Sequence, residues 1–148
     1  HERLYETQDL SKINVEGYMQ SLIYHIKETF ESNIKFNIDI VDFDLLPDTL
    51  IPCGLIVTEI VSNTIKHAFA GQETTESELW LKGGKDDAGM VHFEIRDNGK
   101  GLPSDLNPSK SPGLGLNLVS SLLAQLKGKM GIPQGQEGAV FRLSFPDV

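Results

Sequence analysis

Four polar residues stand close together in an otherwise apolar stretch near the middle of the chain. Glu59, Asn63 and His67 recur every four residues, so on a helix they would share one face. Lys66 stands at the edge of that face. An amide oxygen can bind Mg²⁺, a lysine can neutralise phosphate, and a carboxylate can act as a base or orient a water. A solvent-facing stripe on an amphipathic helix is the plainer interpretation of these residues taken by themselves.

A second group of candidate residues follows the strand-like run 90–96. Asp97 stands where that strand is expected to end, and Gly99 and Gly101 allow positive φ and close approach of the backbone to a ligand. A carboxylate fixed at such a tip can accept a hydrogen bond from an exocyclic amine, such as that of adenine. An ordinary Asp-Asn-Gly turn is the alternative interpretation.

The third group is the run 112–119, in which Gly113 and Gly115 precede a helical pattern. The free N–H groups and the dipole at the start of a helix attract anions. The run is not a Walker A loop, because no Gly-Lys-Ser/Thr follows at the required spacing, and an ordinary helix start is the alternative. A fourth run, 138–143, indicates most simply the closing strand of a hairpin.

Hydrophobic periodicity predicts the elements that must position these groups. The predicted order is a helix capped by Asn14, strand 35–41, a helix from about Leu50 to Phe69, strands 78–82 and 90–96, a loop at 98–112, helix 114–126, and strands 129–132 and 140–145. Pro47 and Pro52 are expected to precede the second helix, and Gly71 to end it. Short turns between consecutive strands imply a mostly antiparallel sheet. With about three helices on one face, the sequence predicts a two-layer α/β sandwich.

Composition narrows the functional classes. The chain has 148 residues, 39% hydrophobic, and its net charge of −8 argues against nucleic acid as a partner. Cys53 is the single cysteine, which excludes an internal disulfide and favours a reducing, cytoplasmic setting. No apolar run approaches the ~18 residues of a membrane-spanning helix, so no membrane contact is expected of these residues.

Taken in order, the three groups resemble the motifs of a known family, the ATP-binding domain of sensor histidine kinases, in the superfamily shared with gyrase, Hsp90 and MutL. EIVSNTIKHAF at 59–69 resembles its N box, DNGKG at 97–101 its G1 box, and GLGLNLV at 113–119 its G2 box. The resemblance covers roughly Val15 to Phe145 and implies a Bergerat-type fold. The start of the chain resembles the segment that follows the phosphoacceptor helices in one subgroup of these kinases.

The resemblance implies roles for individual residues. Asp97 would hydrogen-bond the adenine amine, and Gly99 and Gly101 would let the backbone pass close to the base. Asn63 would bind the Mg²⁺ that bridges the phosphates of ATP, and Glu59 is the candidate general base.

Further contacts to ATP are implied along the same motifs. Lys66 and His67 would approach the phosphates or the ribose, and residues 102–112 would form the ATP lid. Gly113 and Gly115 would place backbone N–H groups near the phosphates. The full set implied at the nucleotide is Asn63, Lys66, His67, Asp97, Gly99, Gly101, Leu102, Gly113, Leu114, Gly115 and Leu116.

Three departures from the family pattern stand out. Ser111 occupies a position where many of these kinases have a glycine, and Ala139 replaces a threonine that is often hydrogen-bonded near adenine. The phosphoacceptor histidine is absent, and the residues that flank His1 do not match its motif. Without an initiator Met, the chain is expected to be a fragment, with residues 1–14 as the tail of an upstream dimerisation and phosphoacceptor region and 15–148 as the catalytic domain.

The resemblance therefore predicts the catalytic domain of a two-component sensor histidine kinase. Such an enzyme transfers the γ-phosphoryl group of ATP to a histidine on an upstream helix, in cis or in trans, for relay to an aspartate of a response regulator. The fragment by itself is not expected to autophosphorylate. The alternatives are a serine kinase of the anti-sigma-factor type, a non-catalytic ATP-gated interaction module, and an ATPase of the gyrase or Hsp90 kind. Whether the parent protein is membrane-anchored is left open by the sequence.

Overall fold

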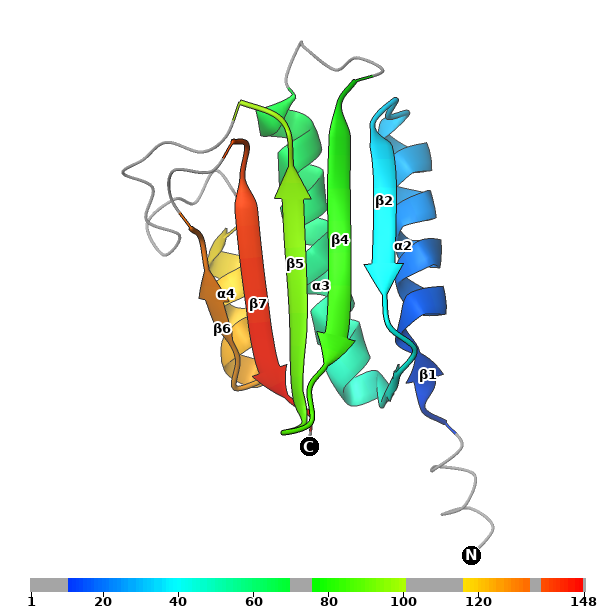
Figure 1. The fold of residues 1–148 in the computed structure, drawn as a ribbon, viewed down its shortest axis with the longest axis vertical. Helices are drawn as coiled ribbons and strands as arrows, with labels where there is room; N and C mark the ends of the chain where they lie inside the picture. The colour runs from blue at the N-terminus through cyan, green and yellow to red at the C-terminus, as the bar shows by residue number, and fades with distance from the viewer. Residues whose placement is uncertain (1–10, 70–75, 101–115, 134–136, 148) are drawn as a thin grey trace, which may run out of the picture.

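Five strands form one sheet, and helices cover one of its faces (Figure 1). The computed structural model describes residues 11–69, 76–100, 116–133 and 137–147. In chain order the elements are β1 (Ile13–Asn14), α2 (Val15–Phe30), β2 (Lys35–Ile40), β3 (Asp44–Leu45), α3 (Pro47–Asn63), the π-helix η1 (Thr64–Ala68), β4 (Glu78–Lys85), β5 (Met90–Asp97), α4 (Leu116–Gln125), β6 (Lys129–Gly131) and β7 (Val140–Pro146). The predicted two-layer α/β sandwich is confirmed.

The sheet is mixed, with the strand order β2-β4-β5-β7-β6. β2 and β4 pair in parallel, and the other neighbouring strands pair antiparallel, so the sheet is mostly antiparallel as predicted. The parallel pair follows from its connection, because the chain leaves β2, crosses over through α3 and returns beside β2. β1 and β3 form a separate two-stranded pair near the start of α2.

The core lies between the sheet and the helices. On β5, Val91, Phe93 and Ile95 are buried, whereas His92 between them is exposed, as in a strand with one face toward the core. The ring of Phe93 stacks on that of Phe145 from β7, with the centroids 6.5 Å apart. The helices contribute the buried side chains of Met19, Ile23 and Ile26 from α2, Ile56, Val57 and Ile60 from α3, and Leu116, Val119 and Leu123 from α4.

Two local features of α2 and α3 are the cap of α2 and the burial of the single cysteine. The side chain of Asn14 accepts a hydrogen bond from the backbone N–H of Gly17 at 3.0 Å, which confirms it as the cap of α2. Cys53 is fully buried in α3, and burial raises the pKa of its thiol to about 12. The thiol is therefore neutral at physiological pH and poorly reactive.

The helix that carries the first candidate group differs from the prediction at both ends. α3 begins at Pro47 rather than near Leu50, because the first helical position does not use the N–H that proline lacks. Pro52 lies inside the helix rather than before it. After Asn63 the α-helix is succeeded by η1, a π-helix, so the prediction of one α-helix to Phe69 is wrong. The predicted end at Gly71 lies outside the described residues.

The strands of the five-stranded sheet agree with the prediction to within one residue, except that β4 is longer, whereas β1 and β3 were not predicted. It continues past the predicted end at Lys82 and pairs with β5 as far as Lys85, which lies opposite Val91. Gly83 provides space there for a buried ring. A Cβ on Gly83 would lie 2.6 Å from Cε1 of Phe93. The β4–β5 hairpin turns at residues 86–89, with Gly89 at a φ of 82°. Within the described ranges, no helix has the length and apolar character needed to cross a bilayer.

Candidate functional site

Asp97 is the last residue of β5, and only 2% of it is exposed. Its Oδ1 accepts two hydrogen bonds from backbone N–H groups, one from Gly99 at 2.8 Å and one from Ala139 at 3.2 Å. Within the part of the chain that the structure describes, no hydrogen bond reaches Oδ2. Two backbone donors therefore fix one oxygen of the carboxylate.

Burial raises the pKa of Asp97 above the ordinary aspartate value, because removal from water disfavours the charged form. The hydrogen bonds from Gly99 and Ala139 act in the opposite direction, but they compensate only in part. The folded chain thus holds a carboxylate whose negative charge is incompletely stabilised. A ligand that donates a hydrogen bond to it would supply some of the missing stabilisation.

Gly138 and Ala139, directly before β7, hold Asp97 from the neighbouring strand. In addition to its N–H contact, Ala139 accepts a hydrogen bond from the backbone N–H of Asp97 at 3.0 Å. Gly138 has a φ of 79°, and a Cβ there would collide with the backbone carbonyl of Asp97. Glycine is therefore required for steric and conformational reasons.

Sequence reasoning missed this role, because it treated the run from Gly138 as a plain hairpin strand. The glycine two residues before the strand was the available signal, but Asp97 lies 42 residues from Ala139 in the chain. Ala139 makes its contacts through backbone atoms, so the absence of a threonine side chain leaves them intact.

Glu59, Asn63, Lys66 and His67 occupy the end of α3 and the π-helix that follows. Glu59 and Asn63 lie one turn apart on α3 and are half-buried, whereas Lys66 and His67 are exposed in η1. The i→i+5 bonding of a π-helix changes the angular spacing, so the single stripe predicted on α-helical geometry does not extend unchanged to His67. π-Helical turns inside α-helices occur frequently at functional sites.

Lys66 contacts the neighbouring helix. Its Nζ lies 5.5 Å from the centroid of the Phe30 ring at the end of α2, within the range of a cation–π interaction. This contact joins η1 to α2. The contact of Lys66 with phosphate stays a prediction.

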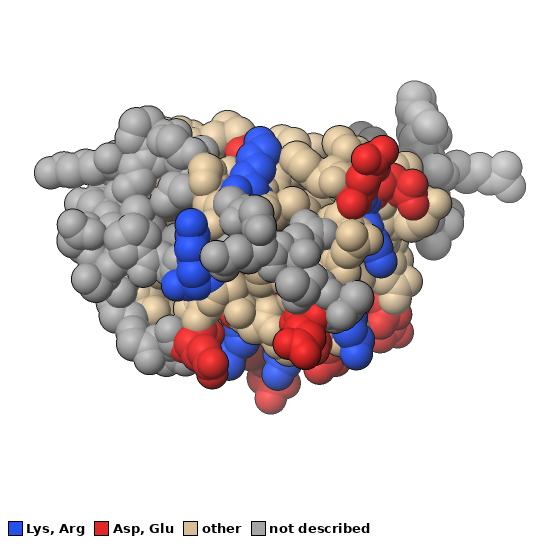
Figure 2. All heavy atoms as spheres, turned by 90° about the horizontal axis from the view of Figure 1, so that it is seen from above, with Lys and Arg blue, Asp and Glu red and all other residues tan. Residues whose placement is uncertain are grey.

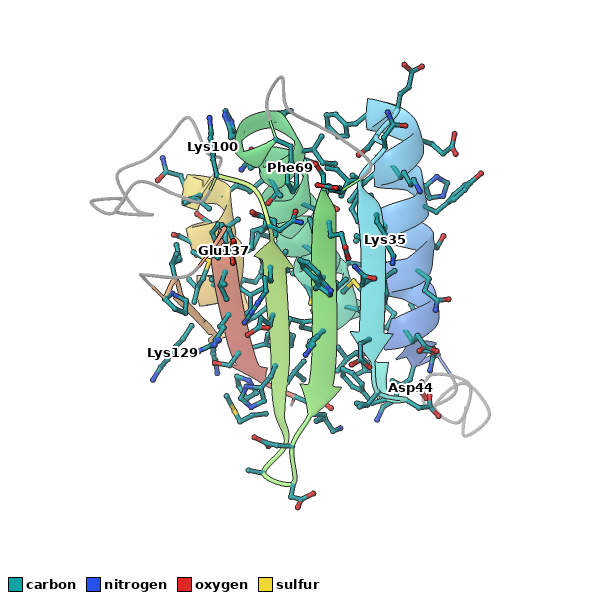
Figure 3. The ribbon with its side chains drawn as sticks, turned by 45° about the horizontal axis from the view of Figure 1, so that its top comes forward. Lys35, Asp44, Phe69, Lys100, Lys129 and Glu137 are labelled. Carbon is teal, nitrogen blue, oxygen red and sulfur yellow. The ribbon has the colours of Figure 1, made fainter. Side chains whose placement is uncertain are left out.

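The first two candidate groups lie at the same end of the molecule. β5 ends there beside η1 (Figure 1), and Figure 3 shows Lys100, which follows the Asp97 turn, at the same end as Phe69, which follows η1. Figure 2 looks onto this end: Lys and Arg side chains stand between its centre and its left, and along the right and lower edges further Lys and Arg side chains lie among the acidic ones. An anion would therefore meet local positive charge, although the chain carries a net charge of −8.

The third candidate group is described only at its end. Leu116 is the first residue of α4 and is 1% exposed, so its side chain belongs to the core. α4 packs beside α3. The positions Gly101, Leu102, Ser111, Gly113, Leu114 and Gly115 lie outside the described residues, and their roles stay predictions.

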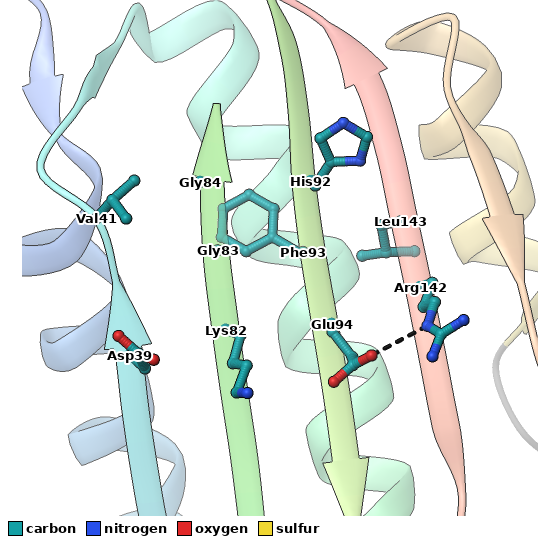
Figure 4. Close-up of a pocket in the computed structure, with 10 residues that line it drawn as sticks. All are labelled: Asp39, Val41, Lys82, Gly83, Gly84, His92, Phe93, Glu94, Arg142 and Leu143. Carbon is teal, nitrogen blue, oxygen red and sulfur yellow. Dashed lines mark hydrogen bonds and ion pairs between the residues drawn. The ribbon is translucent and has the colours of Figure 1, made fainter. Parts of the chain in front are cut away.

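A hollow of about 390 Å³ lies on the sheet face that carries no helix (Figure 4). Four side chains of alternating charge stand in register across β2, β4, β5 and β7, namely Asp39, Lys82, Glu94 and Arg142. Arg142 Nε donates a hydrogen bond to Glu94 Oε1 at 3.0 Å. Cross-strand charge pairs of this kind stabilise sheets, so we assign this hollow a structural role.

The described ranges contain no group of three or more His, Cys, Asp and Glu side chains that could hold a metal. Mg²⁺, however, is usually bound by one or two protein groups together with phosphates and water. The half-buried amide of Asn63, one turn from the carboxylate of Glu59, fits that smaller requirement.

Residues 50–148 match the family of histidine kinase-, DNA gyrase B- and HSP90-like ATPases. The chain belongs to this family. The matched residues include all three candidate groups together with Gly138 and Ala139. The resemblance noted from the motifs is thereby confirmed.

Named members of the family are longer than this chain. Blue-light-activated histidine kinase 2 of Erythrobacter litoralis (strain HTCC2594) is 25% identical over 130 residues, which cover 88% of this chain and 36% of that protein. Sensor histidine kinase PdtaS of Mycolicibacterium smegmatis (strain ATCC 700084 / mc(2)155) is 33% identical over 93 residues, 60% of this chain and 18% of that protein. The chain thus spans 36% or less of the length of these two relatives.

Solved structures of histidine kinases share the fold. The blue-light-activated histidine kinase EL346 of Erythrobacter litoralis superposes with a TM-score of 0.83 at 23% identity, covering 91% of this chain and 42% of that one. The mycobacterial sensor histidine kinase MprB superposes with a TM-score of 0.71 at 15% identity, covering 91% of this chain and 95% of that one. At these identities the likeness establishes the fold.

We predict that Asp97→Asn raises the free energy of unfolding at neutral pH, because asparagine keeps an oxygen acceptor but carries no charge to desolvate. Since the pKa of Asp97 is raised by folding, its favourable contribution is complete below the unfolded pKa of about 3.9 and is lost as pH rises through the folded value. The difference in free energy of unfolding in favour of Asp97→Asn should therefore grow as pH rises from the unfolded to the folded pKa, and then level off.

Urea denaturation at a series of pH values measures this difference. The control is Asp87→Asn in the exposed β4–β5 turn, which should change the free energy of unfolding by less than about 0.5 kcal/mol. An advantage of Asp97→Asn that grows toward acid pH would contradict the prediction.

Proposed function

We propose that the chain is the catalytic, ATP-binding domain of a two-component sensor histidine kinase. The observation that carries the proposal is the buried carboxylate of Asp97, with Oδ1 held by two backbone N–H groups, at the end of the molecule where the Asn63 helix also ends. A base site and a phosphate site at one end are what a nucleotide requires. Membership of the ATPase family supports the proposal.

In this proposal Asp97 recognises adenine. An ionised carboxylate accepts hydrogen bonds and cannot donate them. Oδ1 already accepts from Gly99 and Ala139, so Oδ2 would select a ligand group that donates. The exocyclic amine of adenine is such a donor, whereas guanine and hypoxanthine present a carbonyl oxygen at that position. Gly99, half-buried beside Asp97, and Gly101 would lie along the base.

The phosphates would lie at the end of α3 and along η1. Asn63 would hold Mg²⁺ through its amide oxygen, and the bound ion would neutralise phosphate charge. Lys66 and His67 are exposed and would approach the phosphates or ribose, Lys66 after leaving its contact with Phe30. Gly113 and Gly115, with Leu102 and Leu114 nearby, would complete the site from the lid side.

The acceptor would be a histidine on the phosphoacceptor helix upstream of this domain, which would then pass the phosphoryl group to an aspartate of a response regulator receiver domain. Glu59 would act as the general base toward the histidine. Ile51 and Leu55, one turn apart on α3, are 50% and 48% exposed, and Leu118 on α4 is 47% exposed, so both helices present apolar side chains that an amphipathic helix could contact. A cytoplasmic location follows from the need for ATP.

We predict that Asp97→Asn lowers the affinity for ATP by roughly 10- to 100-fold, the value of a hydrogen bond to a charged group. Isothermal titration calorimetry with Mg-ATP measures the effect, and Asp87→Asn is the control on the same hairpin. Because Asp97→Asn is also expected to be the more stable chain, lost binding cannot be ascribed to unfolding. An unchanged affinity would remove Asp97 from the base site.

Asn63→Ala should reduce the dependence of ATP binding on Mg²⁺. The gain in affinity on adding Mg²⁺ should fall by about tenfold, equivalent to ~1.4 kcal/mol of lost ligation. Titrations with and without Mg²⁺ measure this gain, and Ser62→Ala, a half-buried neighbour on α3, is the control. The metal role of Asn63 is wrong if Mg²⁺ increases the affinity for ATP equally in Asn63→Ala and in the unaltered chain, while circular dichroism shows that the variant is folded.

Glu59→Gln in the full-length parent protein should slow autophosphorylation by roughly 100-fold, as expected for loss of a general base, with the affinity for ATP within about twofold. Incorporation of γ-³²P measures the rate. Glu16→Gln, exposed in the first turn of α2, is the control. Equal rates in the two variants would show that Glu59 is not the base.

A further inference from the structure

Asn98, which directly follows Asp97, makes an unusual set of contacts for an exposed loop residue. Its Oδ1 accepts a hydrogen bond from the backbone N–H of Glu78 at 2.8 Å, and its Nδ2 donates to the carbonyl of Glu76 at 2.8 Å. Its own backbone N–H donates to the carbonyl of Glu78 at 3.2 Å. The side-chain amide therefore acts as an additional peptide group that prolongs the pairing of β4 with β5 by one step.

These contacts fix the chain on the far side of Asp97. Leu79 pairs with Asp97 at the end of the β4–β5 ladder, so β4 lies directly beside Asp97. Asn98 then begins the turn that follows Asp97. The hydrogen bond from Gly99 N–H to Asp97 Oδ1 requires the backbone at Asn98 to fold back over the strand end. The amide of Asn98 holds that backbone against the first residues of β4.

We propose that Asn98 is a positioning residue that orients Asp97 for recognition of the nucleotide base. Asp97 is held by Ala139 on the β7 side, and Asn98 holds the Gly99 turn on the β4 side. Without the amide, residues 98–99 are tied to β4 by one backbone hydrogen bond, and Oδ1 of Asp97 loses a fixed donor. The inference rests on the proposed function, because it assigns Asn98 an effect on the base site described there.

A purely structural role predicts a different outcome. Asn98 is exposed, and water can replace its side-chain hydrogen bonds, so their loss alters the stability of the fold little. Asn37 provides a matched comparison, because its Nδ2 also makes two contacts to β4, with Glu78 Oε2 at 3.0 Å and the carbonyl of Leu79 at 3.3 Å. Asn37 lies on β2, and both of these contacts are to β4 rather than to the turn after Asp97.

The experiment compares binding of ATP and inosine triphosphate, which has a carbonyl oxygen where adenine has its amine, by calorimetry on the 148-residue chain with Mg²⁺. The unaltered chain should prefer ATP by at least roughly tenfold. Asn98→Ala should lower the affinity for ATP by about tenfold and that for inosine triphosphate by less than about twofold, so that the preference disappears. Asn37→Ala should keep both affinities.

Asn98→Asp is the second variant, because it keeps the acceptor for Glu78 N–H and loses the donor to Glu76. It should keep part of the preference, and it serves the same purpose if Asn98→Ala does not fold. If the unaltered chain prefers ATP and either Asn98 variant keeps the full preference, the role of Asn98 is overturned and base recognition by Asp97 is not. Equal binding of the two nucleotides by the unaltered chain would overturn base recognition by Asp97 and the role of Asn98 with it.

Discussion

The hydrogen bonds from Gly99 and Ala139 to one oxygen of Asp97 are the interaction on which the candidate site depends. They fix a carboxylate that burial would otherwise disfavour in its ionised form. To provide them, three segments must meet at one point, namely the end of β5, the turn after it and the residues that enter β7. The left-handed backbone of Gly138 is the local consequence, since no side chain fits between it and Asp97.

The helix layer and the sheet contribute different kinds of group to the same end of the molecule. The sheet supplies a rigid acceptor, because Asp97 is buried and belongs to a strand paired on both sides. The helix layer supplies Asn63 and the exposed Lys66 and His67, near a change from α- to π-helical bonding. In the proposed function, the adenine base, which does not react, would be bound by the stiffer sheet. The phosphates, which react, would be bound by the more exposed helix layer.

Much of the fold could be predicted from the sequence because its determinants are local. The alternation of Val91, Phe93 and Ile95 and the cap at Asn14 each depend on a few neighbouring residues. The missed features depend on tertiary context. The π-helix after Asn63 leaves no mark in the spacing of apolar residues, and the contact of Gly138 with Asp97 joins distant parts of the chain.

The candidate site was predicted to a smaller extent. The position of Asp97 at a strand end follows from the pattern of β5, but its second hydrogen-bond donor does not. The common helical face expected for Glu59, Asn63 and His67 relied on uniform α-geometry. The contact of Lys66 with Phe30 could not be predicted, because it depends on how α2 packs against η1.

The parallel pairing of β2 with β4 bears on the order in which the molecule forms. β5 can find β4 through a short turn, but Lys35 must find Glu78 across the whole of α3. Contacts between residues far apart in sequence form slowly, because the entropy of closing a long loop is lost before the contacts compensate for it. The helix that carries Glu59 and Asn63 lies inside that loop. The hairpin that ends in Asp97 can therefore form before the helix that carries Glu59 and Asn63 is in place, and the site is complete only after the distant strands β2 and β4 have paired.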